Sequence, residues 1–442
     1  MNLIRPESSV AKEDVTTVFD QLKASGLLKT PEGVAIWLTI GLRFPDFEFP
    51  SGIWHKNDPL NKKERQNLAN VLRGVTDDTS EEPTEDAANG AKKHKKMKGS
   101  PPQSTLNFAW TVVFTTIIQR QEEQHESKDK LRGSSEFTKF WVEVVDNSLF
   151  SNVASPQRKL LGFQLLSKCI ATCPDWAIQS LFSPNLRRCL INQRKDSERY
   201  LHNASKASLT AMQSRASSSP DTTATIVFGL IKEEKGFVNF DKLTQSKTIE
   251  NLIATASEDA LLEIVQFLLD QITHIQPGET ASAEALRRSV ADLLMQVVRN
   301  RKEEQLKASI NAEGDTWLHL LLDSFVQFAY FIPSEGTKHS VPVPPLSKNS
   351  KSVFQSRISS SLTHILSTKV DESVSIPYYV TARLRKHRKS SSGLAMALQA
   401  DKQVLRTIKD AQSTVDVINV KVSAGFTIIC RHPRLTSTGN GR

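Results

Sequence analysis

Residues 261–298 read LLEIVQFLLDQITHIQPGETASAEALRRSVADLLMQVV and contain two apolar stripes at helical spacing. The first stripe recurs every three or four positions, at Leu261, Val265, Leu268 and Ile272. The second stripe has the same spacing, at Leu286, Val290, Leu293 and Val297. This periodicity places each stripe on one face of an α-helix. The short Pro-Gly connection between the stripes predicts an antiparallel helix hairpin.

Helix signals continue on both sides of this hairpin. A hydroxyl residue stands directly before a proline at Thr30-Pro31, Ser155-Pro156, Ser183-Pro184 and Ser219-Pro220. Such a pair predicts a helix start, because the hydroxyl caps an amide and proline has no amide to lose. Residues 317–331 are apolar on nearly all sides, which predicts a buried helix. Convincing strand alternation is absent, so the sequence predicts an all-α fold.

The succession of helices without strands predicts an α-solenoid of HEAT/armadillo-like helix hairpins with disordered loops. No fixed repeat is visible by eye, so a compact helical bundle stays open as the alternative. The expected segments are helical repeats over 1–75, a disordered acidic/basic loop over 76–104, a helical repeat array over 105–333, a Pro/Ser loop over 334–352, C-terminal helices over 353–420 and an irregular tail over 421–442. The tail is a natural extension or an artefact of gene prediction; both readings stay open.

Composition narrows the class of protein. Lys and Arg number 57 against 48 Asp and Glu, a net charge of +9, which favours polyanionic partners such as nucleic acid or acidic protein tails. Four cysteines are too few for a disulfide framework, so Cys169 and Cys173 are interpreted as buried thiols in a reducing compartment. No stretch reaches the roughly 18 apolar residues of a membrane span, and the amino terminus has no apolar signal region. We expect no membrane partner.

Catalytic motifs are missing from the sequence. It has no P-loop, G-x-G-x-x-G, G-x-S-x-G or H-E-x-x-H pattern. Two-metal nucleotidyl transfer needs carboxylates that converge on the ions, whereas acidic pairs such as Asp196 and Glu198 are scattered over expected helix surfaces. His55 is interpreted as a turn residue rather than a base. We expect no catalytic residue, no metal and no cofactor, and we favour a binding protein over an enzyme.

Basic clusters are the better functional lead. A nuclear import signal, read by an import receptor, is predicted at Lys92, Lys93, Lys95, Lys96 and Lys98. The alternative is a solvated linker that the preceding acidic run neutralises. A second cluster for phosphate or rRNA contact, or for import, comprises Arg383, Arg385, Lys386, Arg388 and Lys389. A solvated helix end explains this second cluster equally well.

A third basic cluster is expected on a helix that follows Asn192. Four side chains with helical spacing are predicted to line one face, namely Lys195, Arg199, His202 and Lys206. Arg187, Arg188 and Arg194 lie just before them in the sequence. A basic ridge on a rigid helix suits sequence-independent contact with a phosphate backbone. An ordinary solvent-exposed helix face stays the alternative.

The same stretch carries a family resemblance. LFSPNLRRCLINQ at 181–193, DSERYLH at 196–202, PQRKLLGFQ at 156–164 and, more weakly, PSGIW at 50–54 resemble the DNA polymerase V / DNA polymerase phi family, the Myb-binding protein 1A-like proteins. The resemblance covers about residues 10–420 and is specific only around 150–210. It implies a fungal member with a helical-repeat fold, located in the nucleolus of the nucleus.

The resemblance also implies a function. Members act as scaffolds that bind rDNA or rRNA, or pre-ribosomal and transcription proteins, in rRNA transcription and large-subunit ribosome biogenesis. The alternatives are a DNA-directed DNA polymerase, as the family name suggests, and a protein-only transcriptional co-regulator. Because members are usually longer and end in an acidic tract, we expect this chain to be a fragment or a truncated gene product.

Overall fold

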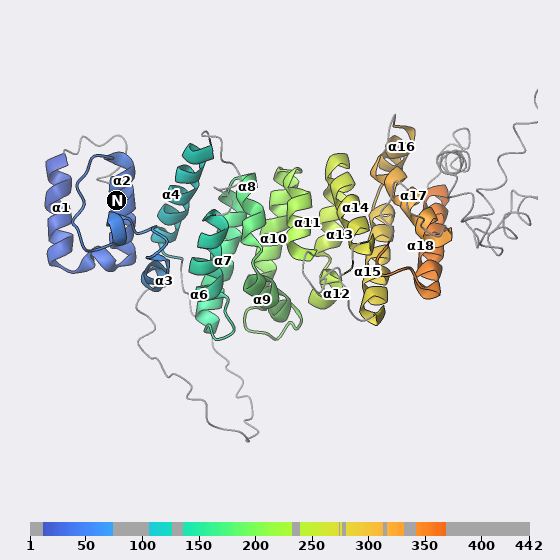
Figure 1. Ribbon diagram of the computed structural model, residues 1–442, viewed down its shortest axis with the longest axis horizontal. Helices are drawn as coiled ribbons and strands as arrows, with labels where there is room; N and C mark the ends of the chain where they lie inside the picture. Colours follow the sequence, from blue (N-terminus) through green and yellow to red (C-terminus); the bar gives the residue numbers. More distant parts are fainter. Residues whose placement is uncertain are drawn as a thin grey trace, which may run out of the picture. The chain divides into compact units, whose positions relative to one another are not determined.

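The computed structural model describes residues 12–73, 106–125, 136–231, 239–273, 275, 280–312, 316–330 and 342–367. Every regular element in these residues is a helix, as Figure 1 shows, which confirms the all-α prediction. The one extended pairing in the same residues is a short backbone bridge. There the amide of Val343 donates to Thr273 O at 2.9 Å, and the amide of Ile275 donates to Val343 O at 3.1 Å.

The chain divides into two compact units, Met1–Ser214 and Arg215–Arg442. The boundary between the two units lies inside the range 105–333, and the bounds predicted for the helical repeat array stay a prediction. Apolar periodicity predicts which face of each helix is buried, but it does not predict which helices gather into one unit.

In the second unit the described helices are α11 (Thr222–Ile231), α12 (Phe240–Thr244), α13 (Thr248–Thr255), α14 (Glu258–Thr273), α15 (Thr280–Arg299), α16 (Glu303–Asn311), α17 (Trp317–Tyr330) and α18 (Lys348–Ser367). The longer ones form hairpins, with α11 packed on α13, α14 on α15 and α17 on α18. The first members, α11, α14 and α17, contact one another in one row, and the second members, α13, α15 and α18, form another. Paired helices stacked in two rows are the arrangement of HEAT and armadillo solenoids, which confirms that prediction.

The hairpin predicted from residues 261–298 is the α14–α15 pair. Its stripe residues are buried, among them Leu261 and Leu268 of α14 and Val290 and Val297 of α15. The buried helix predicted from 317–331 is α17, in which the side chain of Trp317 is completely buried. No repeat is visible in the sequence because the repeating unit is a pair of packed helices rather than a fixed pattern of residues.

Two buried guanidinium groups hold the hairpins of this unit together. Arg301 follows α15 and donates from Nη2 to Ile253 O at 2.8 Å and Ala256 O at 3.0 Å, at the carboxyl end of α13. Arg287 of α15 donates from Nε to Ile272 O at 3.3 Å near the end of α14, and its other nitrogens donate to the carbonyls of Pro344 and Pro345. The last carbonyls of a helix have no partner within it, so a buried cation can satisfy them.

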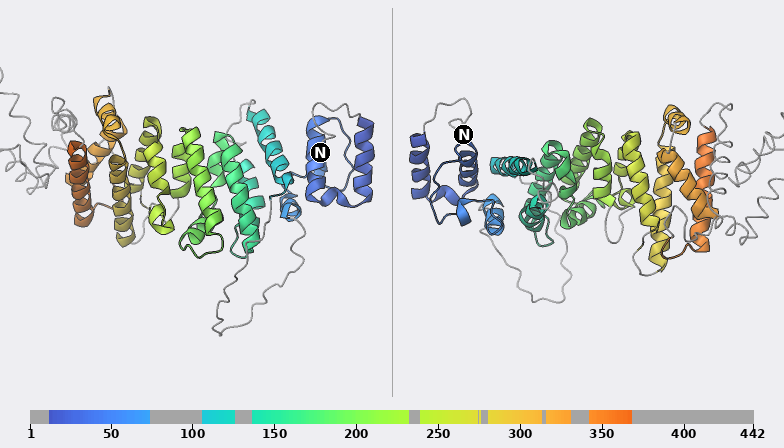
Figure 2. Two further views of the ribbon diagram at one scale, coloured as in Figure 1. Left: turned by 180° about the vertical axis from the view of Figure 1, so that it is seen from behind. Right: turned by 45° about the horizontal axis from the view of Figure 1, so that its top comes forward.

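The first unit contains α1 (Lys12–Ala24), η2 (Leu27–Lys29), α2 (Pro31–Arg43), η3 (His55–Asn57), α3 (Arg65–Arg73), α4 (Phe108–His125), the wide-turned η4 (Trp141–Asp146), α6 (Asn147–Leu149), α7 (Pro156–Thr172), α8 (Asp175–Ile178), η5 (Gln179–Leu181), α9 (Pro184–Arg194) and the first part of α10 (His202–Ser218). Helix α2 packs on α4, α3 packs on η4, and η4 packs on α9. Two views in Figure 2 show these helices following one another as a stack. Helices that follow one another in the chain therefore also pack together in this unit.

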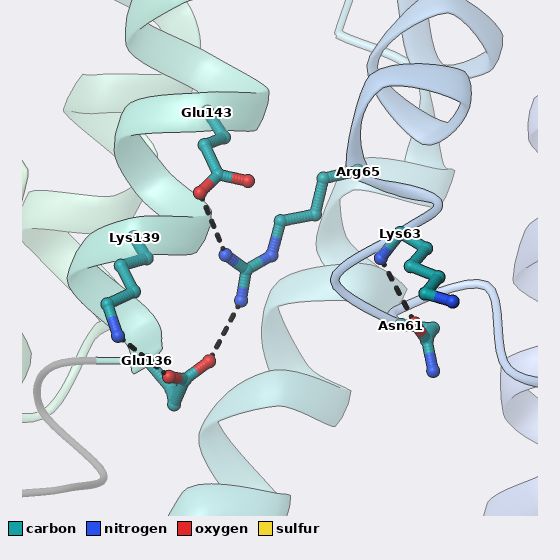
Figure 3. Close-up of polar contacts among 6 residues, drawn as sticks. All are labelled: Asn61, Lys63, Arg65, Glu136, Lys139 and Glu143. Carbon is teal, nitrogen blue, oxygen red and sulfur yellow. Dashed lines mark hydrogen bonds and ion pairs between the residues drawn. The ribbon is translucent and has the colours of Figure 1, made fainter.

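An ion-pair cluster joins α3 to the helical segment that begins at residue 136. The guanidinium of Arg65 donates to Glu136 Oε2 at 3.0 Å and to Glu143 Oε1 at 3.1 Å, as Figure 3 shows. Lys139 approaches the other oxygen of Glu136 at 3.1 Å. The Arg65 side chain is only 8% exposed, so its charge depends on the two carboxylates for compensation.

The predicted helix starts are confirmed at Pro31, Pro156 and Pro184, and the fourth helix begins two residues after Pro220. Thr30 Oγ1 accepts from the amide of Gly33 at 3.1 Å, and Ser155 Oγ accepts from the amide of Arg158 at 3.3 Å, as helix caps do. Ser183 does not cap α9 with its own side chain, and after Ser219-Pro220 the helix α11 begins only at Thr222. A carboxylate from a distant helix replaces Ser183 as the cap, which no local pattern reveals.

Three further findings concern loops and thiols. Helix α18 begins at Lys348, inside the loop predicted over 334–352, because the Ser347 hydroxyl accepts from the amide of Ser350 at 3.1 Å. Cys169, Cys173 and Cys189 are buried and form no disulfide within the described residues, in agreement with the interpretation of the first two as buried thiols. Among the described residues no helix is long and apolar enough to span a bilayer.

Candidate nucleic-acid interface

The helix predicted to carry the basic ridge is interrupted. Helix α9 ends at Arg194 and α10 begins at His202, so the expected single face with Lys195, Arg199, His202 and Lys206 is wrong. The break begins at Asp196, whose Oδ1 accepts from the amide of Glu198 at 3.0 Å. Asp favours such side chain–backbone turns over helix, and the helical spacing of the cations concealed this preference.

A partly buried contact closes the turn between the two helices. Arg194 Nη1 lies 2.5 Å from His202 Nε2, and His202 Nδ1 lies 3.1 Å from the carbonyl oxygen of Asp196. This geometry fits a neutral imidazole that accepts from Arg194 at Nε2 and donates to Asp196 O at Nδ1. Burial lowers the pKa of the Arg194 guanidinium, because desolvation disfavours the charged form.

The contact changes the roles of two predicted binding residues. Arg194 is only 8% exposed and His202 is half-buried. A phosphate needs direct access to a cation, so Arg194 cannot serve as a backbone contact. Both residues instead hold the end of α9 against the start of α10.

Three of the predicted cations are exposed around this contact. Lys195 and Arg199 lie on the turn, and Lys206 follows in the first part of α10. We call these three residues the basic turn. Two exposed carboxylates, Asp196 and Glu198, share it. The cations thus outnumber the carboxylates. Lys195 and Arg199 project from the short, hydrogen-bonded segment between the helices, and Lys206 projects from α10.

The two arginines at the start of the predicted set lie elsewhere on α9. Arg188 is exposed and donates to Asn152 Oδ1 at 2.9 Å and to Asn185 Oδ1 at 3.1 Å. Arg187 is half-buried. These contacts orient Arg188 toward the loop before α7, so it is an accessory to the basic turn rather than part of it.

One further candidate for nucleic-acid contact, not predicted from the sequence, lies in the turn between α9 and α10. The side chain of Tyr200 is 46% exposed and lies between Arg199 and the buried Leu201 in the chain. An exposed aromatic ring next to cations can stack on a nucleic-acid base. The sequence alone does not single out Tyr200, because its exposure follows from its position in the turn between α9 and α10.

The other two predicted clusters lie outside the described residues. They are the import candidate, Lys92, Lys93, Lys95, Lys96 and Lys98, and the second basic cluster, Arg383, Arg385, Lys386, Arg388 and Lys389. In the part of the chain that the structure describes, no three His, Cys, Asp or Glu side chains gather as a metal site would require.

Comparison with known proteins identifies the family. The DNA polymerase phi family matches residues 4–425. The rDNA transcriptional regulator pol5 of Schizosaccharomyces pombe is 25% identical over 432 residues, which are 94% of this chain and 41% of the relative. The rDNA transcriptional regulator POL5 of Saccharomyces cerevisiae is 30% identical over 265 residues, 56% of this chain and 25% of the relative. No solved structure matches the chain.

These matches agree with the resemblance read from residues 156–202. The chain spans less than half the length of each of the two relatives. The family match nevertheless extends from near the first residue through all the described helices. By this match the chain belongs to the DNA polymerase phi family.

Proposed function

We propose that this chain is a nuclear, nucleolar scaffold that regulates rDNA transcription by binding nucleic acid through the basic turn. The relatives' names, rDNA transcriptional regulator, support the process. The observation that carries the molecular part is the exposure of Lys195, Arg199 and Lys206 around the Arg194–His202 contact. Because the Arg194–His202 contact holds the turn in place, its cations lose less conformational entropy when they bind phosphates.

The chemistry of this surface supports sequence-independent binding. Lysine and arginine side chains neutralise backbone phosphates and release counter-ions, whatever the base sequence. Such contacts position a protein on rDNA or rRNA, and protein partners in transcription or pre-ribosome assembly then supply specificity. Through this role the chain supports rRNA production and large-subunit ribosome biogenesis. The lysines of 92–98 provide entry to the nucleus by an import receptor.

Salt-dependent binding tests the proposal. The full chain is titrated into fluorescent mixed-sequence duplex DNA and single-stranded RNA at several salt concentrations. A variant with Lys195→Gln, Arg199→Gln and Lys206→Gln loses up to three phosphate contacts, so the slope of log affinity against log salt falls by roughly two to three. The matched control replaces the exposed Lys23, Lys62 and Lys63 of the same unit with Gln.

The outcomes separate the candidate functions. Weaker binding by the basic-turn variant with an unchanged control supports the proposal. Equal loss in both variants contradicts it, since the charge of the whole chain then explains binding. If the unmodified chain binds neither nucleic acid at physiological salt, the proposal fails and the protein-only co-regulator is favoured.

A further inference from the structure

A pocket in the second unit has a lining suited to an anion. It measures about 400 Å³ and lies where the end of α15 meets α18. Five side chains line it: Arg299, Ser359, Ser360, Thr363 and His364. One is a guanidinium, one is an imidazole, three are hydroxyls and none is a carboxylate.

A neighbouring contact between α15 and α18 contains a carboxylate, which the pocket does not. Arg357 Nε of α18 lies 2.5 Å from Asp292 Oδ1 of α15, so a carboxylate balances the cation there. About two helical turns further along each helix, the corresponding residues are Arg299 and His364. Because both residue numbers rise together, the helices run in the same direction and the second contact repeats the first. At the second contact, however, the carboxylate has been replaced by a cation.

The pocket presents hydrogen-bond donors as well as charge. Arg299 is exposed, whereas Ser360 and His364 are half-buried. Thr363 Oγ1 donates to Ser359 O at 2.9 Å, so its proton is already used within the helix. Arg299 and His364 both line the pocket. Burial, and next the charge of Arg299, lower the pKa of His364.

We propose that this pocket binds a phosphate monoester group. Guanidinium, imidazole and serine hydroxyl donors match the oxygens of a phosphate, and guanidinium does so with two parallel hydrogen bonds. The volume lies near the lower end of the ~300–1,000 Å³ of ligand pockets, which leaves room for part of the group that carries the phosphate. An isolated pocket with one strong cation suits a single terminal phosphate, whereas a nucleic-acid backbone needs a succession of cations.

The site is independent of the basic turn and belongs to the other unit. The carbonyl ends of α15 and α18 offset part of the positive charge, since a helix ends with a partial negative charge. We therefore expect weak binding, with a dissociation constant of roughly 0.1–1 mM.

Titration of the full chain tests the proposal. Inorganic phosphate, O-phosphoserine and adenosine 5′-monophosphate are added separately in phosphate-free buffer, and binding is followed by calorimetry and by NMR of the His364 ring. Arg299→Gln and His364→Gln should each weaken binding about tenfold or more, because each removes a charge-assisted hydrogen bond. Arg288→Gln, an exposed arginine on the same helix outside the pocket, is the matched control and should bind normally.

Circular dichroism keeps the test interpretable by showing that each variant is folded. Saturable binding that Arg299→Gln removes and Arg288→Gln keeps supports the proposal, and the rank order of the three ligands shows what carries the phosphate. Absence of saturation by about 10 mM of every ligand overturns it. Equal affinity in all three variants overturns it as well.

Discussion

The carboxylate of Asp146 accepts a hydrogen bond from the hydroxyl of Ser183 at 2.6 Å, although the two residues belong to different helical segments. The same carboxylate accepts from the amides of Asn185 at 3.2 Å and Leu186 at 2.8 Å, at the start of α9. Trp141 Nε1 in turn donates to Ser183 Oγ at 3.2 Å. The end of η4 therefore caps α9, the helix that leads into the basic turn.

Replacement of Asp146 with Ala should destabilise the first unit. It removes the cap of α9 and leaves buried donors without an acceptor, a loss of about 2–4 kcal/mol in the free energy of unfolding. Urea denaturation followed by tryptophan fluorescence measures it. Thr30→Ala, which removes one capping bond and an exposed bond from the hydroxyl to Leu27 O, is the comparison and should cost about 1 kcal/mol. Similar losses for the two variants would show that Asp146 acts as an ordinary cap.

Gly33→Ala should be more harmful than Gly41→Ala, although both glycines lie in α2. A Cβ on Gly33 would come within 2.2 Å of Leu27 O, a backbone atom of η2. The expected loss is at least about 1–3 kcal/mol. At Gly41 the nearest atom belongs to the Phe49 ring at 3.5 Å, an ordinary contact, so alanine should be neutral or stabilise the helix by up to ~1 kcal/mol. Thermal unfolding of the two variants tests this order.

Cys189 should resist alkylation in the folded chain. Burial raises the pKa of its thiol to about 11, so very little thiolate exists at neutral pH. Burial also raises the pKa of Cys169. Treatment with iodoacetamide at pH 7.5, followed by mass spectrometry of peptides, should modify both only after addition of denaturant. Rapid labelling of Cys189 in the native chain would contradict the buried position.

Acid should destabilise the second unit partly through His364. Its pKa in the folded chain lies below the ordinary value of 6.5, so the unfolded state binds the proton more readily. The stability that the neutral ring contributes is therefore present above about pH 6.5 and is lost as the pH falls below it. The difference in melting temperature between His364→Gln and the unmodified chain should shift in favour of the variant between pH 8 and pH 5.5, in phosphate-free buffer.

A second variant identifies the cause of this effect. Burial is the larger cause of the lowered pKa, and the charge of Arg299 is the smaller. With Arg299→Gln in the background, His364→Gln should therefore show a reduced but measurable dependence on pH. An unchanged dependence would mean that Arg299 does not act on His364.

Local patterns in the sequence were sufficient for the helices but not for their contacts. The stripes through Leu261 and Val290 identified a hairpin because burial alone decides such spacing. The prediction of a basic ridge on one helix was wrong because Lys195 and Arg199 have helical spacing, whereas Asp196, between them, favours a turn. Exposed residues carry no packing constraint, so their periodicity alone does not predict a helix.

Long-range polar contacts were beyond the sequence for another reason. Asp146 reaches Ser183, Arg301 reaches Ile253 and Arg357 reaches Asp292 across intervals that no periodicity links. Arg299 and His364, which line the pocket, are likewise far apart in the sequence and are linked by no periodicity. Charged residues on a helix look alike in a sequence, whether they end in solvent or on the carbonyls of another helix.

The two-row stacking of the second unit has a consequence for how such proteins change in length. Helix α12 lies between the two members of the α11–α13 hairpin, α16 connects the α14–α15 hairpin to the α17–α18 hairpin, and neither belongs to a row. Extra residues in these connectors leave both rows intact, and removal of a whole hairpin lets the remaining ones meet through equivalent surfaces. Size can therefore evolve in steps of one hairpin, while each surviving hairpin keeps the neighbours that stabilise it.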